Sequence, residues 1–130
     1  MPTPQELVSA IRKLVKESPN AVYHSVFDKV KGKYNCLYGH GQATNNRCGC
    51  LIGQGLVDIG IELLPQWDNF EHEVGNCLSA FAVSKYIWPD CPYEIAEWLD
   101  VLQGEQDNGA KWQQCLEEAD KAHPSIREIT

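Results

Sequence analysis

The sequence predicts an α+β fold, a single helix-dominated domain of residues 1–130 with a small antiparallel β-hairpin. Three observations lead to this class. Apolar residues recur at helical spacing in several segments. Two short segments near residue 30 are instead rich in valine and aromatic residues, which is typical of strands. A chain of 130 residues with 43% hydrophobic content can bury one core, and no linker or internal repeat divides it.

The first helix is predicted over residues 4–17. Thr3 and Glu6 have the spacing of a capping box, in which each side chain accepts a hydrogen bond from the other residue's backbone N–H. Pro4 suits the first helical position because an N–H there would have no partner within the helix. Pro19 disfavours helical backbone in the residue before it, so the helix should end just ahead of this proline.

A β-hairpin is predicted from residues 21–27 and 34–38, because the intervening residues 28–33 have turn chemistry. A short hairpin is weakly stable by itself. Either helices cover it, or a second copy of the chain pairs with its free edge. The second arrangement would make the protein a dimer.

The next helix is predicted over residues 48–59, ended by Gly60 in the left-handed conformation with Ile61 as its hydrophobic contact. Glycines inside or beside this helix each cost up to about 1 kcal/mol relative to alanine. They are Gly49, Gly53 and Gly55. Close packing of a second backbone explains them best, and an open face that receives a ligand is the alternative.

In the second half, residues 68–83 are predicted to form an irregular helix. Residues 88–92 contain two prolines and break the chain. Helical spacing resumes at residue 93 and is interrupted within residues 104–109, which predicts an antiparallel helical hairpin. The tail after residue 124 is expected to fray.

Charge is distributed unevenly along the chain. Residues 1–66 carry 7 Lys+Arg against 5 Asp+Glu, whereas residues 67–130 carry 4 against 13, within a net charge of −7. The acidic half disfavours nucleic-acid binding and favours a basic partner surface. The apolar runs are too short to cross a membrane and the N-terminus lacks the features of a signal peptide, so a cytoplasmic protein without membrane association is expected.

The six cysteines are expected to be thiols, because the cytoplasm keeps cysteine side chains reduced. Cys77 and Cys115 lie in apolar helical patterns, which indicates small core residues. Four residues in or near the loop 39–50 are potential zinc ligands, namely Cys36, His40, Cys48 and Cys50. Cys48 and Cys50 lack the Cys-x2-Cys spacing that structural zinc sites favour, so neither a metal nor a cofactor is predicted.

Two other uses of this loop stay open. Cys48, with His40 in the same loop, would lie near a helix N-terminus, where a thiol is readily converted to the nucleophilic thiolate. Alternatively, the same helix start could bind an anion through Arg47 and Gly49, or a ligand on an open face beside Arg47, Cys50 and Gly53. Neither arrangement matches an established motif.

Several motifs carry a resemblance to other proteins. They are Cys36-Leu37-Tyr38, Gly49-Cys50-Leu51-Ile52-Gly53-Gln54 with Leu56, Gly60-Ile61, Gln106-Asp107, Gly109, Trp112, Cys115-Leu116 and Ala119-Asp120. Through them about half of the chain resembles a diffuse set of small uncharacterised proteins of actinobacteria and their bacteriophages. The resemblance implies a phage accessory protein that acts on a host component, and it implies no chemistry.

The function predicted from the sequence is therefore a non-enzymatic protein-interaction module. Its acidic helical half, with tryptophans at chain breaks, would contact a host protein or a second copy of the chain. The residues predicted to make this contact are Trp67, Trp88, Glu94, Glu97 and Asp100. The alternative is a small enzyme or anion-binding domain that uses residues 39–50.

Overall fold

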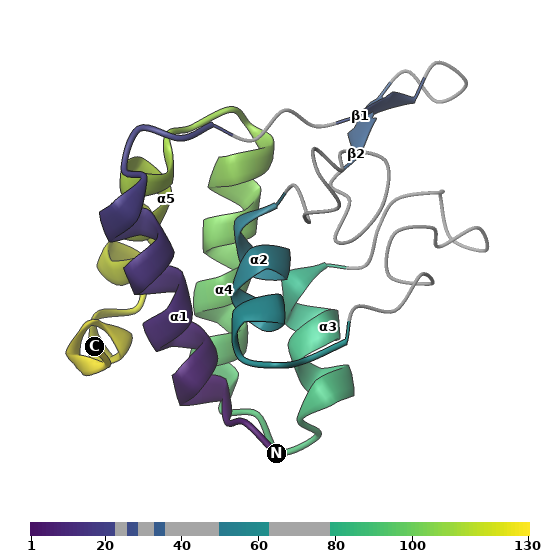
Figure 1. The fold of residues 1–130 in the computed structure, drawn as a ribbon, viewed down its shortest axis with the longest axis vertical. Helices are drawn as coiled ribbons and strands as arrows, with labels where there is room; N and C mark the ends of the chain where they lie inside the picture. Colours follow the sequence, from purple (N-terminus) through teal and green to yellow (C-terminus); the bar gives the residue numbers. More distant parts are fainter. Residues whose placement is uncertain (23–25, 29–32, 36–49, 63–78) are drawn as a thin grey trace.

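The computed structural model describes residues 1–22, 26–28, 33–35, 50–62 and 79–130. In these ranges the chain forms five α-helices and one 3-10 helix, and α4 (Tyr93–Asp107) lies among the others (Figure 1). α4 contacts α1 (Pro4–Glu17), α2 (Leu51–Asp58), α3 (Ala80–Ile87), α5 (Trp112–Ala122) and η2 (Pro124–Glu128). It is therefore the central helix of the domain.

The predicted α+β class is wrong, because the described part of the chain is all-α. β1 (Val26–Asp28) and β2 (Lys33–Asn35) are three residues long and pair antiparallel, with Phe27 opposite Tyr34. Figure 1 shows them projecting away from the helices. Strands of this length supply no layer on which helices could pack. Among the residues whose burial is described, the helices and their connections build the core.

α1 begins and ends where it was predicted. The Thr3 hydroxyl accepts the Glu6 N–H at 3.2 Å, and the Glu6 carboxylate accepts the Thr3 N–H at 3.0 Å. This is the predicted capping box. Leu7, Ile11 and Val15 are buried along one side of α1, which gives the helix the apolar stripe that it packs against its neighbours.

α2 confirms the predicted helix end and begins at Leu51, later than predicted. Gly60 has φ +86°, and its N–H donates to the Val57 carbonyl at 3.0 Å. The N–H of Ile61 donates to the Leu56 carbonyl at 2.9 Å. These two bonds form a Schellman motif, which satisfies carbonyls that a helix end otherwise leaves without partners.

Gly55 allows α1 and α2 to approach closely. A β carbon at this position would lie 3.0 Å from side-chain atoms of both Leu7 and Ile11. Gly53 is also buried. Packing, rather than an open ligand face, therefore explains the glycines of α2 that the structure describes.

α3 differs from the helix predicted over residues 68–83. It begins at Ala80, where the Ser79 hydroxyl accepts the Ala82 N–H at 3.1 Å, and it continues past Val83 to Ile87. A serine cap thus determines the start, which apolar spacing could not locate. Residues 63–78, including Cys77, lie outside the described residues.

The predicted helical hairpin is confirmed by α4 and α5, which run antiparallel (Figure 1). Its break lies at Gly109, which has φ +88° and donates its N–H to the Gln106 carbonyl at 3.0 Å. Gly104 instead lies inside α4. Cys115 is fully buried in α5, as its apolar surroundings predicted.

Two buried glutamines of α4 join it to α2 and α3. The amide oxygen of Gln106 accepts the Leu51 N–H at 2.6 Å, and that of Gln103 accepts the Ala80 N–H at 2.6 Å. Leu51 and Ala80 are the first residues of their helices, where N–H groups have no partner within the helix. Each glutamine therefore satisfies a buried donor and positions a helix start on α4.

The C-terminal tail, predicted to fray, is ordered around Arg12 of α1. The guanidinium donates to both Asp120 carboxylate oxygens at 2.8 Å, to the Ile126 carbonyl at 2.8 Å and to the Ile129 carbonyl. It also lies 5.5 Å from the ring centroid of Trp98, whose indole N–H donates to Asp120 at 3.0 Å. Arg12 thus connects α1 to α5 and to η2, which explains why the tail does not fray.

Candidate functional site

Two of the three acidic residues predicted to bind a partner take part in the fold. Glu94 of α4 accepts a hydrogen bond from the Ser125 hydroxyl of η2. Asp100 accepts the N–H of Phe81 at the start of α3, where a negative charge also suits the helix dipole. Burial raises the pKa of the Asp100 carboxyl, although the bond from Phe81 opposes the rise. These carboxylates connect elements of the domain.

The third residue, Glu97, belongs to an exposed aromatic surface. The Tyr93 hydroxyl donates to the Glu97 carboxylate one turn further along α4. This bond, together with the charge of Glu97, raises the pKa of the Tyr93 phenol, so the hydroxyl keeps its proton at neutral pH. Tyr93 nevertheless remains 63% exposed. The ring of Phe81 from α3 meets it edge-on, with centroids 5.7 Å apart and an interplanar angle of 75°. We call Phe81, Tyr93 and Glu97 the Tyr93 surface.

Carboxylates outnumber cations along the helix that carries Tyr93 and Glu97. α4 carries five carboxylates and no lysine or arginine. The carboxylates are Glu94, Glu97, Asp100, Glu105 and Asp107. The ammonium N–H of Lys85 on α3 donates to the Cys91 carbonyl at 2.6 Å, which holds one positive charge near the start of α4. A cationic group is the chemical complement of such a surface.

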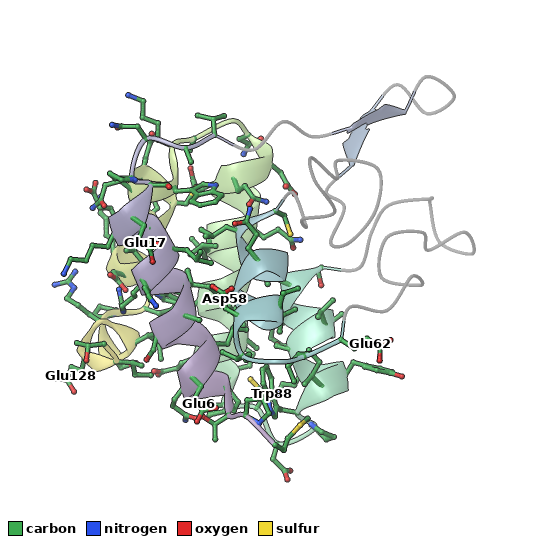
Figure 2. The ribbon with its side chains drawn as sticks, viewed as in Figure 1. Glu6, Glu17, Asp58, Glu62, Trp88 and Glu128 are labelled. Atoms are coloured by element: carbon green, nitrogen blue, oxygen red, sulfur yellow. The ribbon has the colours of Figure 1, made fainter. Side chains whose placement is uncertain are left out.

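Trp88, predicted to be an exposed interaction residue, is buried at 9% exposure. Its indole N–H donates to the Pro2 carbonyl at 2.8 Å, and Figure 2 shows it beside the start of α1. The exposure predicted for Trp88 is wrong, because residues at a chain break need not be exposed. Here the turn between α3 and α4 folds against the N-terminus. Trp67, the other predicted tryptophan, lies outside the described residues.

Most of the alternative site in the loop also lies outside the described residues. This applies to Cys36, His40, Arg47 and Cys48. Cys50 is described and fully buried, and its sulfur accepts the Gly53 N–H at 3.2 Å as the N-cap of α2. Cys50 and Gly53 therefore belong to a helix start that is packed into the core.

The thiols of Cys91 and Cys115 are poorly suited to nucleophilic chemistry. Burial, with added repulsion from Glu105, raises the pKa of the Cys115 thiol to about 12. Burial also raises the pKa of Cys91, although a hydrogen bond with Ser84 and the charge of Lys85 oppose the rise. Both side chains therefore remain thiols at neutral pH.

Comparisons with known proteins give no further assignment, since the chain matches no protein-family model, no curated protein and no solved structure. Within the described ranges, no cluster of three or more His, Cys, Asp or Glu side chains could hold a metal ion. Among the same residues, no helix is both long enough and apolar enough to span a bilayer.

The two aromatic residues of the Tyr93 surface were not among the binding residues predicted from the sequence. The spacing of Tyr93 and Glu97, four residues apart on a predicted helix, was a detectable signal for their contact. Phe81 gave no such signal, because helical apolar spacing placed it in the core. Its side chain is in fact partly exposed at the edge of the core, beside α4.

Proposed function

We propose that this protein is a non-enzymatic protein-interaction module that binds its partner through the Tyr93 surface. The observation that carries the proposal is the exposure of Tyr93 at 63%, although Phe81 packs against its ring and Glu97 accepts its hydroxyl. Aromatic residues that combine apolar area with a polar tip are enriched at protein interfaces. The surface offers both an aromatic anchor and an orienting carboxylate.

Rigidity also supports the proposal. Tyr93 is the first residue of α4, and that helix is joined to α3 through both Gln103 and Asp100. The two helices that carry the surface are therefore linked to each other. Because an anchor already ordered before binding loses little conformational entropy, the Tyr93 surface is suited to recognition.

The resemblance to small actinobacterial and phage proteins suggests the class of partner. On this proposal the protein acts in the cytoplasm of a bacterial cell as a phage accessory protein, and its partner is a protein of the host. A second copy of the chain is the competing partner. Size measurement in solution, by light scattering at several protein concentrations, separates the two.

The proposal is tested by comparing proteins captured from an actinobacterial lysate on the immobilised full chain and on variants. Tyr93→Ala combined with Glu97→Gln should lose the specific partner. Gln113→Ala combined with Glu117→Gln is the matched control, because Gln113 donates to Glu117 at 3.0 Å in the same four-residue spacing on the exposed face of α5. Identical captured proteins on both variants and on the wild type would refute the proposal.

A further inference from the structure

We infer that the Tyr93 surface receives an arginine side chain of the partner protein. This inference rests on the proposed function and names the chemical group that the surface recognises. Three properties of the surface carry it, namely an exposed aromatic ring, a carboxylate beside that ring and an excess of carboxylates over cations on the helix that carries both.

The ring and the carboxylate together match the two binding modes of a guanidinium group. A guanidinium is planar and weakly hydrated, so it stacks on an aromatic face while its N–H groups donate to a carboxylate. Tyr93 keeps ring area exposed beside Phe81. The Glu97 carboxylate has about four lone-pair positions, of which the Tyr93 hydroxyl occupies one. One arginine can therefore contact the ring and the carboxylate at once.

Charge selects a cation over a neutral or anionic group. The absence of lysine and arginine from α4 leaves its five carboxylates without a basic neighbour on the same helix. Glu94 and Asp100 have hydrogen-bond donors, Ser125 and the Phe81 N–H, but neither donor carries a charge. Lys85 of α3 supplies one positive charge near the start of α4, where residues 94–100 carry three carboxylates. A net negative charge therefore remains around Glu97, and it would attract a partner cation from a distance.

The experiment is an NMR titration of the isotope-labelled full chain with N-acetyl-arginine amide. N-acetyl-citrulline amide, which has a nearly identical shape without the charge, serves as the matched probe. Arginine should cause saturable shifts at the backbone amides of Phe81, Tyr93 and Glu97. Binding of citrulline should be about tenfold weaker, because it lacks the charge-assisted bond and the cation–π contact.

Variants locate the binding group. Tyr93→Leu should weaken arginine binding about fivefold, the factor expected for an exposed cation–π contact, and Glu97→Gln should weaken it similarly. Glu117→Gln, which removes an equal charge from α5, should leave it unchanged. An equal response to citrulline overturns the inference, as do an absence of shifts and shifts at Glu117 as large as those at Glu97.

Failure of this inference is distinguishable from failure of the proposed function. If the arginine probe does not bind but lysate capture still depends on Tyr93, the surface binds a protein through another group, and only the arginine assignment is lost. If capture does not depend on Tyr93 and the probe does not bind, both are refuted.

Discussion

The inward and outward sides of α4 use polar side chains in different ways. On the inward side, Gln103 and Gln106 each accept a backbone N–H from another helix. On the outward side, Tyr93 donates to Glu97 on the same helix, and both groups remain accessible. The inward contacts connect elements, whereas the outward contact orients two side chains. Polar groups of the first kind determine the fold, and those of the second kind are available to a partner.

The physical difference is the cost of losing a partner. A buried N–H without an acceptor forfeits about 1 to 3 kcal/mol, because water cannot replace the missing bond. An exposed hydroxyl or carboxylate regains its hydrogen bonds from water. Substitutions on the inward side of α4 should therefore lower stability, whereas substitutions on the outward side should affect the binding of a partner.

The largest effect is expected for Gln106→Ala. It removes the acceptor for the buried Leu51 N–H and leaves a cavity, so the free energy of unfolding should fall by about 3 kcal/mol. Urea denaturation measures this value, with Gln113→Ala on the exposed face of α5 as the control. A loss as small as that of the control would mean that the inward glutamine does not position α2.

An intermediate, pH-dependent effect is expected for Asp120→Asn. Burial by itself would raise the pKa of the Asp120 carboxyl, but bonds from Arg12 and Trp98 and the charges of Arg12 and Arg127 lower it overall. A lowered pKa in the folded state stabilises the protein above the ordinary value of 3.8, and this stabilisation is lost as the pH falls through the folded-state pKa.

The variant should therefore be less stable than the wild type by about 1 to 2 kcal/mol at pH 7, a value that allows for partial solvent access. The difference should shrink as the pH falls below about 3.8. Urea denaturation between pH 3 and pH 7 measures it for both proteins. A difference that stays constant with pH would show that the Asp120 charge does not secure the contact with Arg12.

The smallest effect on stability is expected on the outward side. Glu97→Gln and Tyr93→Leu should each leave the melting temperature within about 2 °C of the wild type, because both remove local surface contacts. Calorimetry measures this change. A large drop in the melting temperature of either variant would show that the Tyr93 surface stabilises the fold. The two sides of α4 would then not differ in their roles.

Part of the candidate site was predictable from the sequence. Glu97 was predicted to be a binding residue because acidic residues accumulate in the second half of the chain, and it belongs to the Tyr93 surface. Trp88 was predicted because it lies at a chain break, and it is buried because its partner is the Pro2 carbonyl 86 residues away. An excess of acidic residues can be counted in the sequence, whereas the exposure of one aromatic ring depends on which distant segment packs over it.

Local signals determined several elements of this protein before any tertiary contact was known. The capping box of α1, the left-handed Gly60 and the break near Gly109 each depend on bonds between residues at most five apart, so the nearby sequence contains all the partners. The placement of α2 on α4, the order of the tail and the all-α class were decided by tertiary structure. Gln106 and Leu51 are 55 residues apart, and Arg12 and Asp120 are 108 apart. Such partners meet only when the helices pack, and no local pattern encodes which buried donor a glutamine will reach or which acceptors an arginine will reach.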